Sequence, residues 1–576
     1  MFFVTSSRSG KGRSCACSRW QENFFFVGVA FICIGLNVNG AGAQTTGGAA
    51  DPGRIQERID RPDRKPKDVA PLSVPVTPKV PEAGEVEKFR LIGAEIVGST
   101  VYTPERLADF YDPFLNREIT LDQVDSIVKA LTEQYRQDGY FLARVIAPPQ
   151  GVEFGILRLR VIEGFIEDVV FTGVKPGRPA LFDEWIGRIT AERPLTLSTL
   201  ERNLLLMADV PGLAVTPGVK AKDAERGAYV LELALKHSKI EGFASVDNRG
   251  TTTVGPMQLY AGINFNSIFG LLERTRLAVF TVPQTPEELL YFEFQQDHLL
   301  NSHGTQGWLF ASRSSVDIGI AGTGSKENSF GTRVTLGFSH PWIRSRELNF
   351  YTSLKFDAFD SDKHSTGSAF DDKVRSLRIG ARFNGTDDFG GTNWLSAEFS
   401  KGFDVLHASD RGSSLLSRTN GRSKYIKATL DVTRTQKLLD SLQIEFNAAG
   451  QWSPHTLLSA EEFAVGGQRF GRAYDPADIS GSQGAAGSAE LQYAPPFELP
   501  DFLNSVQLFG FYDIGAVWGT GFTRDSMASV GAGIRIGFAN SFRAQLEAAQ
   551  PLTRTRTPGE AGHDDPRFFF SLSGQF

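Results

Sequence analysis

Cysteine is nearly missing from this chain of 576 residues, and the three that are present, Cys15, Cys17 and Cys33, all lie within the first 33 residues. No disulfide framework can therefore hold the rest of the chain together. Past the N-terminal region, no stretch reaches the roughly 20 apolar residues that a membrane-spanning helix requires, which argues against a helical membrane protein. A basic excess is also lacking, since 60 Lys and Arg against 66 Asp and Glu give a net charge of −6. This balance argues against a nucleic-acid-binding protein, whose footprint is a basic patch.

The usual signs of catalysis are lacking as well. The histidines are scattered, and the pair His298 and His303 has no third ligand close by in the sequence. No Walker A loop and no G-x-S-x-G turn is present. We therefore expect no enzymatic activity, no catalytic or metal site and no cofactor.

What is present begins with a segment typical of secretion, residues 1–43. A basic start is followed by the apolar run Phe24–Leu36, and the small residues Ala41-Gly42-Ala43 precede Gln44. This order predicts a signal peptide cleaved between Ala43 and Gln44. The alternative is an N-terminal membrane anchor, but the apolar run is short for spanning a bilayer. A mature chain without cysteine suits an exported protein of the bacterial envelope.

Residues 44–87 are polar and rich in proline, which predicts an extended linker. Within it, Asp51–Ile59 has the features of a short helix. Asp51 is placed as the N-cap, Pro52 stands at the first helical position, and Ile55 and Ile59 are four residues apart.

Two α+β repeats are expected next, at residues 88–165 and 166–238. In the first, Thr120–Gln123 is a capping box, and Gly139 ends the helix that follows it. The apolar residues of that helix have helical spacing: Val124, Ile127, Val128, Leu131 and Tyr135. Similar segments recur in the same order in the second repeat, where Pro194–Leu197 resembles Glu118–Leu121, as a tandem array predicts.

From residue 239 to Phe576 the helical pattern disappears, and many short segments alternate between apolar and polar residues. Alternation alone fits either a soluble β-sandwich or a transmembrane barrel with its apolar face outward. Export and length favour the barrel, because this region offers about 21 residues for each of 16 strands. The terminal strand ends in Phe576, which resembles the signal by which outer-membrane barrels are recognised for insertion.

Inside this region, Phe463–Tyr493 is rich in glycine and carries Arg469, Arg472, Tyr474 and Asp475. Loops usually lie on the surface and move. Here the glycines allow close backbone approach, and the arginines and the aromatic ring need partners. The stretch is therefore either a mobile surface loop or a loop held inside another part of the protein.

In its order of segments, the chain resembles the outer-membrane transporters of two-partner secretion, of the haemolysin-activation and haemagglutinin-secretion type. Three motifs of the repeats carry the resemblance: Tyr135–Tyr140 (Y-x-x-x-G-Y), Val161–Gly164 (V-x-E-G) and Leu204–Gly212, which is similar to L-L-x-x-D-x-P-G. Pro148-Pro149-Gln150 resembles a further strand signal. In that family the repeats are periplasmic POTRA domains, Asp51–Ile59 corresponds to a plug helix, and the barrel has 16 strands.

The family also has a loop that folds into the barrel lumen, which the resemblance places at about residues 463–487. Its tip carries a V-R-G-Y type motif, matched here by Gly471-Arg472-Ala473-Tyr474 and followed by Asp475; Ala473 stands where the family has glycine. The tip arginine meets an acidic residue in an F-x-D-x-G strand, matched by Phe511–Gly515. The resemblance thus implies a latch formed by Arg472, Tyr474 and Asp513.

The function implied is that of a pore in the outer membrane, with the POTRA domains in the periplasm. It would recognise an unfolded exoprotein and translocate it to the cell surface without ATP. The expected partners are this secreted exoprotein, outer-membrane lipid and lipopolysaccharide, and the barrel-assembly and periplasmic chaperone machinery, with no nucleic acid. The alternatives are a factor that assembles other outer-membrane proteins and a passive porin-like channel.

Overall fold

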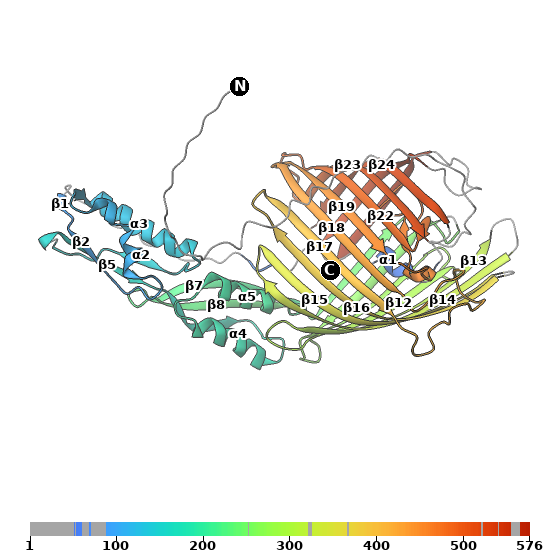
Figure 1. The fold of residues 1–576 in the computed structure, drawn as a ribbon, viewed down its shortest axis with the longest axis horizontal. Helices are drawn as coiled ribbons and strands as arrows, with labels where there is room; N and C mark the ends of the chain where they lie inside the picture. Colours follow the sequence, from blue (N-terminus) through green and yellow to red (C-terminus); the bar gives the residue numbers. More distant parts are fainter. Residues whose placement is uncertain are drawn as a thin grey trace, which may run out of the picture. The chain divides into compact units, whose positions relative to one another are not determined.

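The computed structural model describes residues 51, 53–59, 68–70, 88–151, 153–251, 253–320, 325–365, 368–519, 522–539, 541–553 and 565–576 (Figure 1). All of these residues belong to one compact unit. The expected signal segment, with Ala43 and Gln44, and most of the expected linker lie outside the described residues. None of the described helices is long and apolar enough to cross a membrane.

The first described element is the short helix α1, Ile55–Ile59. It begins later than the sequence predicted. The carboxylate of Asp51 accepts a hydrogen bond from the Gly53 N–H at 2.8 Å, and the Arg54 N–H donates to the Asp51 carbonyl at 3.0 Å. Asp51 therefore closes a turn ahead of the helix, because its side chain competes for a nearby backbone donor.

The first repeat contains two small sheets, β1–β3 and β2-β5-β4, in which β2 and β5 run parallel. Its long helix has the predicted capping box: the Gln123 N–H donates to Thr120 Oγ1 at 3.4 Å, and the Thr120 N–H donates to Gln123 Oε1 at 2.9 Å. The elements are β1 (Lys88–Arg90), β2 (Gly93–Val97), α2 (Pro104–Ala108), η1 (Asp112–Phe114), β3 (Glu118–Thr120), α3 (Leu121–Gln137), β4 (Arg144–Ile146), η2 (Glu153–Gly155) and β5 (Ile156–Ile162).

Two of the sequence motifs meet in this repeat. The hydroxyl of Tyr135 donates to Glu163 at 3.1 Å, and the same carboxylate accepts from the N–H groups of Thr100 (2.8 Å) and Val101 (3.2 Å). Glu163 therefore fixes the turn after β2 to the end of α3. The two motifs act here as one structural contact.

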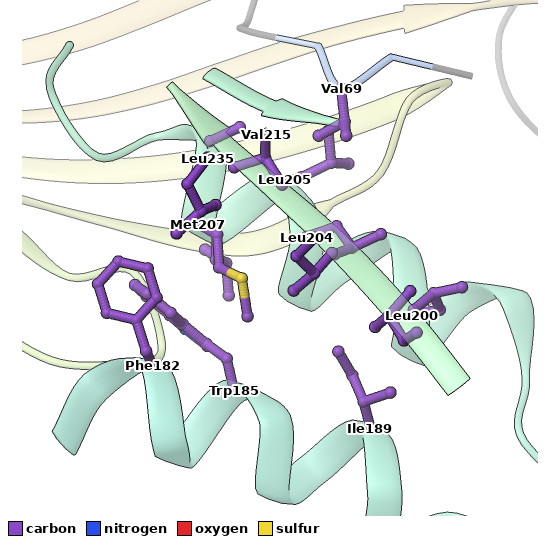
Figure 2. Close-up of a cluster of buried hydrophobic side chains, with 14 of the residues drawn as sticks. Val69, Phe182, Trp185, Ile189, Leu200, Leu204, Leu205, Met207, Val215 and Leu235 are labelled. Atoms are coloured by element: carbon purple, nitrogen blue, oxygen red, sulfur yellow. The ribbon is translucent and has the colours of Figure 1, made fainter. Parts of the chain in front are cut away.

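The second repeat has the sheet order β6-β8-β7 against two helices. Figure 2 shows Phe182, Trp185 and Ile189 of one helix facing Leu200 and Leu204 of the other in a buried cluster. The first of these helices was not predicted, although its apolar residues have helical spacing. The elements are β6 (Phe165–Thr172), α4 (Pro179–Ala191), α5 (Leu197–Ala208), β7 (Leu213–Asp223) and β8 (Ala228–His237).

Sixteen of the strands from β9 to β26 form a closed antiparallel barrel, which confirms the predicted fold class. β26 pairs with β9 to close the cylinder. The strands are β9 (Ile240–Asp247), β10 (Gln258–Asn266), β11 (Glu273–Thr281), β12 (Leu289–Leu299), β13 (Gln306–Ile320), β14 (Ser325–Arg344), β15 (Leu348–Ser365), β16 (Ser368–Thr386), β17 (Gly391–Gly402), β18 (Ile426–Leu439), β19 (Leu442–Trp452), β22 (Gln483–Tyr493), β23 (Leu503–Gly519), β24 (Phe522–Phe538), β25 (Phe542–Pro551) and β26 (Arg567–Gln575).

Alternation along these strands separates an outer apolar face from a polar lumen. Large apolar side chains such as Phe292, Leu336 and Ile379 are exposed on the outer face. The second repeat leads directly into β9, so β9 starts at the end of the barrel nearest the repeats. We call this end the near end, and the opposite end, where β11 stops and β12 begins, the far end.

The segment between β19 and β22, residues 453–482, folds back and is largely buried; we call it the lumenal loop. The expected limits of about 463–487 are wrong at both ends, because β19 already ends at Trp452 and β22 already begins at Gln483. After Gln483, the first residues of β22 are glycine and alanine, which lack the apolar alternation of a recognisable strand. The loop contains η3 (Ser459–Glu461) and a small hairpin, β20 (Phe463–Val465) with β21 (Ile479–Gly481).

Candidate functional site

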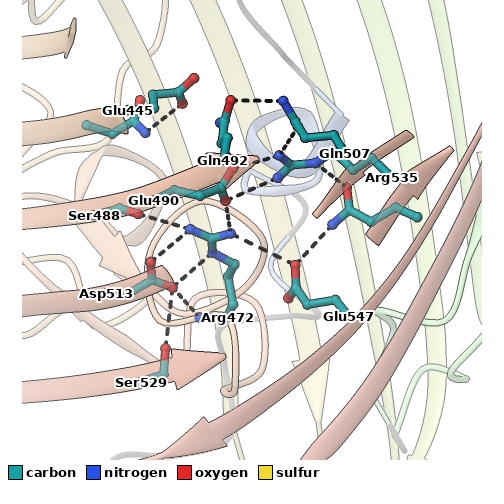
Figure 3. A network of polar contacts seen from close by, with 12 residues as sticks. Glu445, Arg472, Ser488, Glu490, Gln492, Gln507, Asp513, Ser529, Arg535 and Glu547 are labelled. Atoms are coloured by element: carbon teal, nitrogen blue, oxygen red, sulfur yellow. Dashed lines mark hydrogen bonds and ion pairs between the residues drawn. The ribbon is translucent and has the colours of Figure 1, made fainter. Parts of the chain in front are cut away.

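The tip of the lumenal loop meets the barrel wall through Arg472. Its guanidinium donates to both carboxylate oxygens of Asp513, from Nε to Oδ2 and from Nη2 to Oδ1, each at 3.1 Å. Its backbone N–H donates to the same Oδ2 at 3.1 Å. Nη1 donates to Glu490 at 2.6 Å and Nη2 to Ser488 at 3.0 Å (Figure 3). The planar guanidinium fork suits this bidentate geometry, and a lysine could not reproduce it.

This contact lies in a buried network in which charges of opposite sign are matched. Arg472 is 6% exposed and Asp513 is 0% exposed. Buried charges are tolerated when they are paired and hydrogen-bonded. The arginines and carboxylates of the network are Arg249, Arg472, Arg535, Glu490, Asp513 and Glu547.

Aromatic rings pack against two arginines of this network, Arg472 and Arg535. The guanidinium carbon of Arg472 lies 3.6 Å from the centre of the Phe511 ring, and that of Arg535 lies 3.9 Å from the centre of the Phe509 ring. Cation–π contacts of this kind strengthen when they are desolvated. Burial alone lowers the pKa of Arg472, but Asp513 and Glu490 outweigh it and raise that pKa above its usual value. Arg472 therefore stays charged.

The other predicted tip residues lie beside Arg472. Gly471 has φ +77°, and the Tyr474 N–H donates to its carbonyl at 2.9 Å, which closes the turn. The Tyr474 hydroxyl donates to the Ala528 carbonyl at 3.0 Å. Ala473 is 0% exposed. Asp475 accepts from Arg567 of β26 at 2.7 Å, so the tip contacts the wall on two sides.

Two predicted residues lie elsewhere. Arg469, the other arginine of the stretch Phe463–Tyr493, pairs with Asp431 of β18, and its side chain is 48% exposed. Phe576 is 75% exposed. Its backbone pairs with that of Gly242 in β9, next to the seam that closes the barrel.

Sequence reasoning missed the acidic and hydroxyl partners on the wall. Ser488 and Glu490 alternate along β22, and Glu547 lies on β25. A signal for the first two was present, since the polar residues of Ser488–Tyr493 occupy one face of a strand. Nothing in the sequence indicated that Arg472 would reach that face.

The lumenal loop also holds α1. Nη2 of Arg54 donates to the Ser459 carbonyl at 2.8 Å, and the Ser459 hydroxyl donates to Asp51. Arg54 lies 3.8 Å from the carboxylate of Glu462. That carboxylate also accepts from Arg418, in the segment between β17 and β18, at 2.6 Å. The helix, the lumenal loop and a far-end loop are therefore connected by one set of polar contacts.

Glu461 fixes the same part of the loop to the wall. It accepts from Arg378 of β16 at 2.6 Å and from Lys427 of β18. Burial alone raises the pKa of Glu461, but Arg378 and Lys427 outweigh this effect and hold the pKa well below the usual range of a glutamate. The sequence analysis missed this residue because it precedes the expected start of the loop.

At the near end, Arg344 of β14 joins the barrel to the second repeat. It donates to both oxygens of Asp209 at 2.9 Å, and its side chain is 1% exposed. Trp185 adds a hydrogen bond from its indole N–H to the Ser302 carbonyl at 2.7 Å. Asp209 belongs to the L-L-x-x-D-x-P-G motif, so this motif contributes to the contact with the barrel as well as to the core.

A short described part of the linker lies at the same end. Nη2 of Arg346 donates to the carbonyls of Val69 (3.3 Å) and Ala70 (3.1 Å), and Nε lies 3.5 Å from Asp68. Val69 is 4% exposed in the core of the second repeat (Figure 2). Residues 68–70 are thus fixed between the barrel and this repeat.

Among the described residues, no group of three or more His, Cys, Asp or Glu side chains could hold a metal ion. Charged groups of the lumen instead pair with each other, as Arg472 does with Asp513 and Lys427 with Glu461. This arrangement describes a barrel whose lumen is plugged by the lumenal loop and α1.

Comparison with known proteins places these features in a family. Residues 89–164 match the ShlB-type POTRA domain, and residues 306–536 match the haemolysin secretion/activation protein family ShlB/FhaC/HecB. The heme/hemopexin transporter protein HuxB of Haemophilus influenzae is 23% identical over 485 residues, covering 81% of this chain and 84% of the relative. The outer membrane transporter CdiB of Escherichia coli O6:K15:H31 (strain 536 / UPEC) is 23% identical over 456 residues, covering 75% and 73%.

The fold has a solved counterpart. The structure of CdiB from Escherichia coli has a TM-score of 0.67 at 19% identity and covers 87% of this chain and 93% of its own. Together, the POTRA repeats and the closed 16-strand barrel define an outer-membrane transporter with periplasmic POTRA domains. The chain belongs to the two-partner secretion transporter family, whose function is to move a partner exoprotein across the outer membrane.

Proposed function

We propose that this chain passes its exoprotein in extended form through the lumen of its own barrel, and that α1 and the lumenal loop are the closure that must move. The proposal rests on the polar contacts that hold α1 and the lumenal loop in place. Arg472 ties the loop tip to the wall, and the contacts of Ser459 and Glu462 join α1 to the loop. Polar contacts of this kind can be exchanged for others in a polar lumen, so the closure can have two states.

The POTRA domains are proposed to receive the exoprotein first. Both three-stranded sheets have edge strands, β2 and β4 in the first repeat and β6 and β7 in the second. An extended segment can add to such an edge through main-chain hydrogen bonds. The edges thus provide a sequence-tolerant way to hold an unfolded chain near the barrel.

Energy for the movement would come from the exoprotein itself. The sequence has no Walker A loop that would cradle a nucleotide, so we propose that folding at the cell surface prevents the chain from sliding back. Further partners belong to the same proposal: outer-membrane lipid and lipopolysaccharide around the apolar face, and the barrel-assembly and chaperone machinery during insertion. Phe576 is the proposed insertion signal.

Removing the chain from cells tests the transport proposal. We expect one large exoprotein to accumulate in the periplasm while other outer-membrane barrels assemble normally, as followed by fractionation and by heat-modifiable migration of those barrels. A general failure of barrel assembly would instead support an assembly factor. Leakage of small solutes without an effect on any exoprotein would support a passive channel.

Arg472→Ala tests the latch. It leaves Asp513 and Glu490 buried without their shared cation, and breaking a buried pair costs about 3–5 kcal/mol. We expect the loop tip to leave the wall, so that channel openings in planar bilayers become more frequent and secretion falls while the barrel remains folded. Arg469→Ala is the matched control, because its exposed pair contributes at most about 1 kcal/mol. Secretion by Arg472→Ala equal to that of Arg469→Ala would contradict the latch.

A further inference from the structure

One part of the lumenal wall is apolar, in contrast to the charged network around Arg472. Ile55 of α1 is 0% exposed and packs against it, and Ile59 lies beside the same cluster. We call this patch the exit pocket; it is lined mainly by Val254, Phe280, Leu289, Tyr291, Val316 and Ile318.

The exit pocket lies at the far end of the barrel. β11 ends at Thr281 just after Phe280, β12 begins at Leu289, and β13 ends two residues past Ile318. Since the POTRA repeats join the near end and lie in the periplasm, the far end faces the cell surface. An exoprotein that leaves through the lumen must therefore pass this pocket last.

The side chains of α1 show which chemistry the pocket accepts. Ile55 and Ile59 are four residues apart on one face of a helix, and the guanidinium carbon of Arg58 lies 5.5 Å from the centre of the Phe280 ring. Tyr260, which packs against the same cluster, donates a hydrogen bond from its hydroxyl to Glu293 at 2.8 Å. The pocket thus takes two apolar side chains and has an aromatic surface that favours a cation beside them.

An extended chain can present the same pair of apolar groups. Four residues of helix rise about 6 Å. Two residues of a β-strand advance about 6.7 Å and place both side chains on one face. A segment with apolar residues at alternate positions therefore matches the spacing of Ile55 and Ile59.

When α1 leaves, as the proposed function requires, these apolar side chains would face water. Exposing them is unfavourable in proportion to their area. We propose that the exit pocket then binds alternating apolar side chains of the emerging exoprotein, so that α1 and the exoprotein compete for one site. This inference rests on the proposed passage through the lumen.

A pair of variants of the full chain separates seating of α1 from binding of the exoprotein. Ile55→Ser weakens the binding of α1 but leaves the exit pocket intact. Val316→Ser changes the pocket itself, so it weakens the binding of both α1 and the exoprotein. The probe is the exoprotein that accumulates in the periplasm when this chain is removed. Both variants should open more often in planar bilayers than the unchanged protein. Secretion should stay at or above normal in Ile55→Ser and fall about fivefold in Val316→Ser. Equal secretion by the two variants would overturn the inference.

Photo-crosslinking gives a second measurement that does not depend on a substitution that could impair folding. A photoreactive phenylalanine analogue at Tyr291 should crosslink to α1 at rest and to a stalled exoprotein during secretion, at alternating apolar residues. The control carries the analogue at Gln443 of β19, away from the pocket. Crosslinks from position 291 that remain on α1 during stalling, or that equal those from position 443, would overturn the inference. If no exoprotein depends on this chain, it is the proposed function that fails.

Discussion

The arginine at the loop tip is held by shape as well as by charge. Its fork engages Asp513 with two parallel hydrogen bonds while Nη1 reaches Glu490. Such bidentate contacts are stronger and more selective in direction than a single ion pair. The tip therefore has one preferred position on the wall, which is what a closed state needs.

Gly471 allows this position, which leads to a prediction. Its φ of +77° is unfavourable for other residues, and an added Cβ would lie 2.8 Å from Sδ of Met527. We expect Gly471→Ala to destabilise the seated loop by about 1–3 kcal/mol. The expected readout is faster protease cleavage within residues 463–481 of the folded barrel.

Gly487→Ala is the control for that variant. It lies on the neighbouring strand β22, and its added Cβ would come no closer than 3.6 Å to the Asn447 carbonyl. Cleavage of this control should be unchanged. If Gly471→Ala is cleaved no faster than the unchanged protein, the glycine is not required for the turn.

At this scale the sequence predicted which residues form the loop tip better than it predicted their contacts on the barrel wall. The family resemblance brought Arg472 and Asp513 together, and it marked Ala473 as a departure from glycine. In the structure Gly471 supplies the left-handed position, and Ala473 does not need one. Glu490 and Glu547 could not be predicted as partners because they lie on strands whose distance from the loop depends on how the whole barrel closes.

At the scale of elements, α1 is too short to be stable by itself, since isolated helices need roughly 12–15 residues. Its position depends on Ile55 in the exit pocket and on Arg54 at the lumenal loop. The loop in turn depends on Glu461. A change at Glu461 should therefore affect two elements together.

The low pKa of Glu461 predicts how the closure responds to acid. Because the pKa is lower in the folded state than in an unfolded chain, about 4.3, the contact contributes its full stability above that value. The contribution is lost progressively as pH falls below it. We expect few channel openings in planar bilayers from pH 8 to about 5 and more frequent openings below about pH 4.

Glu461→Gln should remove this dependence on pH. The variant leaves Arg378 and Lys427 without their carboxylate, so we expect frequent openings at neutral pH as well. A variant that stays closed at pH 7 and still opens in acid would show that another carboxylate controls the response.

Elements with strong periodicity were predictable, and those without it were not. The capping box at Thr120 and the helix behind it followed directly from the sequence. The start of β22 did not, because Gln483–Gly487 consists mainly of small residues. The helix α4 was missed although Phe182, Trp185 and Ile189 have helical spacing.

At the scale of the whole molecule, a POTRA domain followed by a 16-strand barrel was predictable from length and resemblance. The joint between the second repeat and the barrel was not, since Arg344 and Asp209 are far apart in the sequence. This joint predicts that Asp209→Ala loosens the domain from the barrel, because it leaves Arg344 buried without its carboxylate, at a cost of about 3–5 kcal/mol.

Hydrogen exchange measures this loosening. Amides of α5 and of the turn at residues 300–305 should exchange faster in Asp209→Ala than in the unchanged protein. Glu232→Ala, which removes an exposed pair with Lys220 in the same domain, should leave both segments unchanged. Equal protection in all three proteins would show that the joint does not depend on Arg344.

The anchored linker gives the pore a direction. Eight residues separate Ile59 from Asp68, and this connection can span at most about 30 Å. The apolar band of an outer-membrane barrel is about 25 Å tall. The connection that joins α1 to the periplasmic end is therefore about as long as the barrel is tall. When α1 leaves the exit pocket, as the proposed function requires, this connection would keep an outgoing exoprotein from carrying it out of the cell. Under the proposed function, the helix would remain at a high effective concentration beside the empty lumen after each passage, so that the pore could close again without a further factor.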